Sequence, residues 1–117
     1  MNKYFFTGRA AAAPELVTTN SGTKIARVRL IRNEYAGKDD DGERRERQVS
    51  IPFTAFAGMA ETLAKNVMTG DQLIVAATIR NNNYEKGGED RYDYNFEIVD
   101  FDYGAPGAEK RRKLAEG

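Results

Sequence analysis

The stretch QVSIPFTAFAGMAETLAKNVMTGDQLIVAATIR, residues 48–80, predicts a strand, a short helix and a second strand. In residues 48–56, apolar and polar side chains alternate, which is typical of a half-buried strand. Residues 58–70 place an apolar side chain at every fourth position and end on Gly70, a common helix stop. Residues 71–84 return to a strand pattern, so one helix separates two strands in the middle of the chain.

Strand-like segments flank this stretch on both sides. Residues 2–9 are rich in aromatic side chains, residues 23–35 alternate apolar with basic ones, and residues 91–103 switch their apolar parity at Val99. Residues 37–47, GKDDDGERRER, are charged throughout and predict a mobile loop. Three strands, one helix and two strands predict an all-β fold. We expect a five-stranded Greek-key barrel of the OB-fold type, with one short α-helix between strands 3 and 4.

The length and composition predict one domain and a tail. We expect the domain to span residues 1–103 and residues 104–117 to form a flexible or weakly helical basic tail. The 18 basic and 18 acidic residues cancel, so any attraction for a polyanion must come from a local basic surface. The absence of cysteine is typical of a reducing cytoplasm, and no apolar run approaches the roughly 20 residues of a membrane span.

The sequence has none of the common catalytic constellations. It has no histidine or cysteine, no phosphate-binding glycine loop and no dinucleotide fingerprint. The acidic run at residues 39–43 lacks the ligand spacing of a calcium loop. We therefore expect no catalytic residues, no metal site and no cofactor.

Four segments resemble the bacterial single-stranded DNA-binding proteins, over about residues 1–103. They are MNKYFFTGR followed by PEL, NSGTKIARVRL, FTAFAGMAETLAKNVMTGDQLIVAATIR and EDRYDYNFEIVDF, in order and at nearly unchanged spacing. The resemblance implies a non-enzymatic, cytoplasmic, nucleoid-associated protein that binds single-stranded DNA in replication, recombination and repair. It also implies a homo-oligomer: we expect a tetramer, with a dimer as the alternative, and no membrane partner.

The resemblance implies three aromatic side chains that stack on bases. Tyr35 matches an aromatic residue that the family often has at the end of its second strand. Phe56 matches the aromatic residue at the end of the family's third strand, and Tyr84 matches one where the fourth strand enters its hairpin. Stacking tolerates any base and contributes about 1–3 kcal/mol per base. All three fall on the polar side of their strands, although the pattern alone also fits ordinary half-buried sheet aromatics.

Basic side chains supply candidate phosphate contacts. Guanidinium groups both pair with phosphates and stack on bases, although a solvated surface charge is the alternative for each. The candidates are Lys3, Arg9, Arg27, Arg29, Arg32, Arg80 and Arg91. The basic run at residues 110–113 either adds non-specific phosphate contacts or forms a disordered, solubilising end.

The sequence also departs from the family pattern. Ser50 replaces a second aromatic of the third strand, and four positions that often hold a cation are Thr18, Gly58, Thr69 and Asn82. The chain ends in EKRRKLAEG instead of a long linker and an acidic tip, so we do not expect it to recruit replication and repair enzymes through such a tip. Two alternatives are a dimer similar to the primosomal protein N family that recruits helicase, and an OB module for protein–protein contact.

Overall fold

The computed structural model describes residues 1–82, 84–91 and 93–116, without the side chains of Tyr84 and Arg91. In chain order the elements are β1 (Tyr4–Ala10), β2 (Glu15–Thr18), β3 (Lys24–Lys38), β4 (Arg44–Phe56), α1 (Ala57–Asn66), β5 (Gln72–Asn81), β6 (Tyr84–Lys86), β7 (Glu89–Arg91), β8 (Tyr94–Tyr103) and α2 (Ala108–Glu116). None of the helices in the described part is long and apolar enough to cross a membrane.

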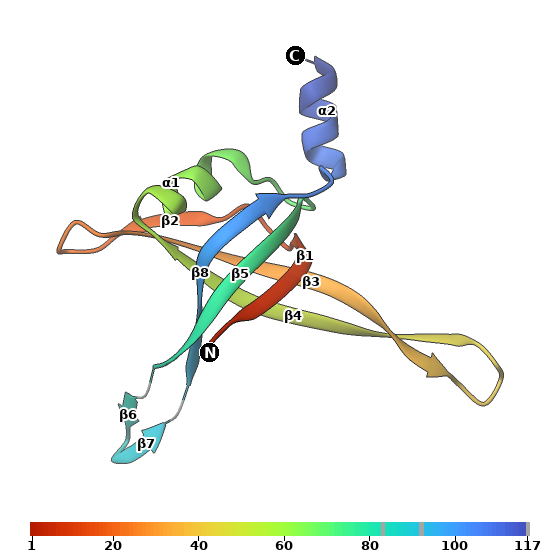
Figure 1. Cartoon of the computed structure of the whole chain (residues 1–117), viewed down its shortest axis with the longest axis horizontal. Helices are drawn as coiled ribbons and strands as arrows, with labels where there is room; N and C mark the ends of the chain where they lie inside the picture. Colours follow the sequence, from red (N-terminus) through yellow and green to blue (C-terminus); the bar gives the residue numbers. More distant parts are fainter. Residues whose placement is uncertain (83, 92, 117) are drawn as a thin grey trace.

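Five strands close into a barrel. The sheet order is β1-β5-β8-β4-β3-β2, and β1 also pairs with β3, where Arg9 lies opposite Ile31 (Figure 1). A Cβ atom on Gly8 would lie 2.9 Å from the carbonyl oxygen of Ile31, so the closure depends on a glycine there. The helix α1 lies between β4 and β5, as predicted for the third and fourth barrel strands. The predicted five-stranded OB-fold is therefore confirmed.

The alternating apolar side chains fill the barrel. Leu30, Phe53, Leu73 and Val75 are fully buried, and Leu63 of α1 is buried with them. Aromatic side chains from three further strand positions pack around the central phenylalanine, with ring centroids 5.7–6.3 Å from it: Tyr4, Phe6 and Phe96. The alternation of apolar and polar side chains that predicts the strands therefore also predicts which side chains form the core.

The charged segment 37–47 is not the loop that the sequence predicts. The strand β3 continues to Lys38 and β4 begins at Arg44, so most of the segment belongs to a long hairpin. The tip is ordered by a side chain, because Asp39 Oδ1 accepts a hydrogen bond of 2.9 Å from the amide of Glu43. The prediction was wrong because cross-strand pairing extends the strands even where no apolar period marks them.

The helix α1 is shorter than the predicted 58–70. It ends at Asn66 because Val67 is extended, with φ −91° and ψ 127°. Gly70 does not stop the helix. With φ +87°, it bends the connection from α1 into β5, a backbone conformation that favours glycine.

The parity switch predicted at Val99 corresponds to a β-bulge. In the pairing of β5 with β8, Ala76 lies opposite Asp100 and Ala77 lies opposite Ile98, so Val99 is the extra residue. The bulge lets apolar residues on both sides of it face the core, although their sequence parity differs. This prediction is confirmed.

After Tyr103 the chain crosses the end of the barrel and forms α2 (Figure 1). The side chain of Asp71, only 4% exposed, receives the ammonium of Lys110 at 2.7 Å. Its oxygens also accept hydrogen bonds from the amides of Gly107 (2.8 Å) and Met68 (2.9 Å). Burial alone would raise the pKa of Asp71, but these donors outweigh it and hold the pKa below the ordinary 3.8. The division into a domain and a flexible tail stays a prediction.

We predict that Asp71→Asn lowers the free energy of unfolding by about 2 kcal/mol at pH 7, because charge-assisted hydrogen bonds are lost. A lowered folded-state pKa stabilises the fold above the unfolded-state pKa. This stabilisation is lost as the pH falls through the folded-state value. Urea unfolding of both proteins from pH 7 to pH 2 should therefore show the difference shrinking below about pH 3.8. A constant difference would contradict this role of the carboxylate.

Candidate nucleic-acid interface

The hairpin of β3 and β4 presents one continuous surface to solvent. Directly opposite residues of an antiparallel pair share a face of the sheet. The pairs on the solvent side, called the outer face below, are Ile25–Phe56, Arg27–Thr54, Arg29–Pro52, Ile31–Ser50, Asn33–Gln48 and Tyr35–Glu46. The core residues occupy the intervening positions. Phe56, Tyr35, Arg27 and Arg29 therefore lie on the same surface, as their sequence parity predicts.

Phe56 is fixed at one end of the outer face. It is the last residue of β4 and is 40% exposed. The next residue, Ala57, has φ +57°, a left-handed conformation that costs a non-glycine residue about 1–2 kcal/mol. This sharp turn starts α1 directly after the aromatic ring, so Phe56 stays at the barrel surface and is not drawn into the helix.

Tyr35 lies at the far end of the same face. It is 56% exposed, and the guanidinium of Arg44 lies 4.9 Å from its ring centroid, so a cation already covers one side of the ring. Ile25, which faces Phe56, precedes Tyr35 by ten residues along β3. That separation corresponds to about 33 Å of extended strand. The two rings therefore mark the ends of a strip and do not form one pocket.

Arg27 and Arg29 occupy the strip between the two rings. Both side chains are exposed. Arg29 donates a hydrogen bond of 2.9 Å from Nη1 to Ser50 Oγ, which orients its guanidinium along the sheet. Arg27 has no ion-pair partner within the described residues. The strip thus carries two exposed positive charges between two exposed aromatic rings.

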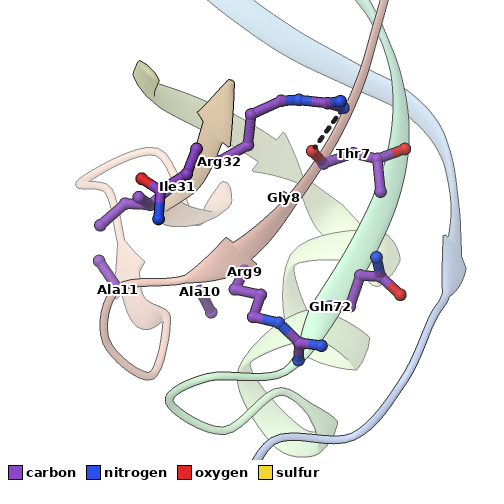
Figure 2. Close-up of a pocket in the computed structure, with 9 residues that line it drawn as sticks. Thr7, Gly8, Arg9, Ala10, Ala11, Ile31, Arg32 and Gln72 are labelled. Atoms are coloured by element: carbon purple, nitrogen blue, oxygen red, sulfur yellow. Dashed lines mark hydrogen bonds between the residues drawn. The ribbon is translucent and has the colours of Figure 1, made fainter. Parts of the chain in front are cut away.

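A hollow between β1 and β3 borders this strip (Figure 2). Arg9 lies opposite Ile31, where β1 pairs with β3 to close the barrel, and its side chain is at one end of the hollow. Its guanidinium donates a hydrogen bond of 2.9 Å to the carbonyl of Gly70. Arg32 lies at the other end, where Nη1 is 3.4 Å from the carbonyl oxygen of Thr7. Arg9 therefore prolongs the outer face across the barrel seam.

Arg32 does not belong to one stripe with Arg27 and Arg29. Along β3 it has the parity of the buried Val28 and Leu30, so its side chain leaves the strand on the other side. Its Nε also lies 3.4 Å from Glu34 Oε1. The structure thus separates one member of the basic stripe from the other two.

Two further candidate cations gather near the root of the β6–β7 hairpin. The side chain of Asn2 donates a hydrogen bond to the carbonyl of Ile79 and accepts one from the amide of Ile79. These two bonds hold the start of the chain, which includes the exposed Lys3, beside β5. Arg80 of β5 forms an ion pair of 2.8 Å with Glu97, whose side chain is 25% exposed. Arg80 is therefore partly neutralised, unlike Arg27.

The β6–β7 hairpin projects from the end of the barrel (Figure 1). Its register places Tyr84 opposite Arg91, and Gly87 and Gly88, both with positive φ, form the tip. The side chains of Tyr84 and Arg91 lie outside the described part of the structure. Their roles in stacking and phosphate binding stay predictions.

Comparisons with known proteins agree with this architecture. The profile of the single-strand binding protein family matches residues 1–103. The chain belongs to this family. A single-stranded DNA-binding protein of Clostridium perfringens is 34% identical over 105 residues, which cover 88% of this chain and 65% of that relative. Single-stranded DNA-binding protein 1 of Streptococcus pyogenes is 32% identical over 91 residues, 78% of this chain and 67% of the relative.

Solved structures of single-strand binding proteins share the fold. The Thermus aquaticus protein superposes with a TM-score of 0.75 at 21% identity, over 89% of this chain and 50% of the other. A Plasmodium falciparum SSB, solved in complex with single-stranded DNA, gives 0.75 at 16% identity, over 89% of this chain and 95% of the other. These likenesses establish the barrel for this member of the single-strand binding protein family.

Two site residues carry no sequence signal of their own. Glu97 matters because it neutralises Arg80, and Ser50 because it orients Arg29. Both contacts join neighbouring strands, so they are visible only once the register is known. Among the described residues, no three acidic side chains lie close enough together to hold a metal ion.

We predict that Glu97→Gln strengthens binding of an oligo-dT about 2- to 5-fold at low salt, because an ion pair of this exposure is worth up to about 1 kcal/mol and its removal frees Arg80. Fluorescence anisotropy titration provides the measurement. Glu61→Gln is the matched control, since Glu61 pairs with Lys24 beside α1 and the change in net charge is identical. Equal effects of the two variants would mean that only net charge matters.

Proposed function

We propose that this protein binds single-stranded DNA without sequence preference along the outer face, and that it has no catalytic activity. The observation that carries the proposal is one surface that holds the exposed ring of Phe56 together with Arg27 and Arg29, neither of which has an ion-pair partner among the described residues. Family membership supports the same role in replication, recombination and repair in the bacterial cytoplasm. The chain spans 65% of the length of the Clostridium relative.

Binding would combine two physical terms. Bases stack on Phe56 and Tyr35, and on Tyr84 of the β6–β7 hairpin, without regard to base identity. The guanidinium groups of Arg27 and Arg29, extended by Arg9, neutralise phosphates and release counterions. A paired duplex buries its base faces, so it can use only the second term. The protein should therefore prefer single strands.

A second surface supports self-association. The side chains of Phe5, Ile74 and Val99 are exposed apolar groups on the adjacent strands β1, β5 and β8, outside the β3–β4 hairpin. Exposed apolar patches on sheets commonly mark subunit interfaces. We propose a homotetramer assembled through this surface. Light scattering should give four times the 13.1 kDa chain mass, whereas a dimer would favour the helicase-recruiting alternative.

Titration of the protein with labelled oligo-dT and with a matched duplex, each at two salt concentrations, tests the proposal. We expect tighter binding of oligo-dT at both concentrations and weaker binding of both ligands at high salt. Equal affinity for the two ligands would contradict base stacking. No binding of either would favour an OB module used only for protein–protein contact.

A further inference from the structure

The segment that follows β8 is held against the barrel by backbone contacts. The amide of Gln72 donates to the carbonyl of Ala105 at 2.9 Å, and the amide of Gly104 donates to the carbonyl of Gln72 at 2.9 Å. Gly107 then packs on Gly70 so closely that a Cβ atom on Gly107 would lie 2.6 Å from the carbonyl carbon of Gly70. The chain is thus guided to one position before α2 begins.

The first turn of α2 is fixed by side chains. Asp71 accepts the amide of Gly107 at 2.8 Å and the ammonium of Lys110 at 2.7 Å. Lys110 also bonds the carbonyl of Asn66 and lies 5.8 Å from the ring centroid of Tyr103. The contacts of Gly107 and Lys110 with Asp71, together with the Gly70–Gly107 packing, are called the tail-docking contacts below.

The tail-docking contacts are continuous with the candidate interface. Arg9, which prolongs the outer face, donates from Nη1 to the carbonyl of Gly70 at 2.9 Å. The next residue, Ala10, exchanges backbone hydrogen bonds with this corner: its amide donates to the carbonyl of Asp71 at 2.9 Å, and its carbonyl accepts the amide of Gly70 at 2.8 Å. The end of β1 and the root of α2 are therefore joined through the same residues, Gly70 and Asp71.

Beyond this root, α2 is basic and exposed. Arg111, Arg112 and Lys113 are all exposed, and the helix carries four cations against two carboxylates, whereas the whole chain is neutral. Such a helix complements a polyanion and lacks the buried apolar face of a core helix.

We propose that the tail-docking contacts hold α2 as a basic helix that extends the phosphate-binding surface beyond Arg9. The inference rests on the proposed single-stranded DNA binding and adds a second, docked element to it. A strand long enough to leave the barrel past Arg9 contacts Arg111, Arg112 and Lys113. A strand that covers only the barrel does not reach them.

Affinities of the full chain for a short and a long oligo-dT, about 8 and about 35 nucleotides, test the inference, since one OB-fold covers about 4–16 nucleotides. The triple variant Arg111→Gln, Arg112→Gln, Lys113→Gln should bind the long strand about 10-fold more weakly at low salt. In a plot of the logarithm of its binding constant for the long strand against the logarithm of salt concentration, the slope should be smaller in magnitude by about 2, because each lost phosphate contact on a single strand removes roughly 0.7. Its binding of the short strand should be unchanged. Lys65→Gln removes one exposed cation at the end of α1 and shows the effect of a single change in net charge.

A second variant tests the docking itself. Gly107→Ala keeps every charge but places a methyl group against the backbone of Gly70, so α2 must move. It should lose part of the long-strand advantage and keep short-strand affinity, and circular dichroism would verify its fold. Should it not fold, Lys110→Met breaks the ion pair with Asp71 instead, and Lys65→Met controls for the lost charge. A variant that binds the long strand like the parent overturns the role of docking.

The outcomes separate the two proposals. If the parent protein binds neither strand, the proposed function itself fails. If the parent binds both but the triple variant binds the long strand equally well, or loses the same factor on both strands, α2 is not an extension of the site and the inference is overturned.

Discussion

Replacing Phe56 with alanine should lower the affinity for oligo-dT about 10- to 100-fold. The ring is 40% exposed on the outer face, and loss of one base–aromatic stack costs about 1–3 kcal/mol. Because the side chain is not part of the buried core, the free energy of unfolding should change by less than about 1 kcal/mol. Anisotropy titration and urea unfolding of the same sample measure both quantities.

Two further substitutions at the same position separate stacking from hydrophobic contact. Phe56→Leu keeps an apolar side chain of similar size but has no flat face, so it should bind nearly as weakly as Phe56→Ala. Phe56→Trp has a larger π-face and should bind at least as tightly as the parent. If the leucine variant kept parental affinity, Phe56 would act as an apolar contact and not as a base platform.

The double variant Arg27→Gln, Arg29→Gln should weaken binding about 10-fold at low salt. It should reduce the log–log salt slope by about 1.4, from roughly 0.7 for each single-strand phosphate contact. Both side chains lie on the strip between Phe56 and Tyr35, and Arg29 is oriented by its 2.9 Å bond to Ser50. Titrations at several salt concentrations give the slope directly.

The control for this variant has the same change in net charge. Lys24→Gln with Lys65→Gln removes two cations from the side of the barrel that carries α1, where Lys24 pairs with Glu61. This control should leave the salt slope almost unchanged. A similar loss of slope in both double variants would mean that the outer face has no special share in phosphate binding.

The barrel could be predicted because its signals are local. The alternation in residues 48–56 and 23–35 marks the two longest strands, and the parity switch at Val99 marks a real bulge. The charged hairpin tip and the end of α1 could not be predicted in the same way. Strand pairing beyond Tyr35 depends on a partner strand, and the helix ends at Asn66 because Val67 turns back towards the core.

The site could be predicted only where one strand decides it. The alternation of side chains along β3 is enough to place Arg27 and Arg29 on the side away from the core. Continued beyond Leu30, the same alternation puts Arg32 on the other side of the strand from these two arginines. The pairing of Arg80 with Glu97 and the docking of α2 on Asp71 join residues that are distant in the sequence. Such contacts depend on the register of the strands and on the path of the chain across the end of the barrel, and neither can be read from a single sequence.

The central claim is that bases stack on the side chain at position 56. The sequence contains no tryptophan, so Phe56→Trp introduces a single indole reporter at that site. We predict that oligo-dT quenches its emission with the same midpoint as the binding seen by anisotropy, and that a matched duplex does not. Thr62→Trp, on the exposed side of α1, reports on quenching away from both the outer face and α2. Oligo-dT that binds the Phe56→Trp protein without changing its emission would contradict the account.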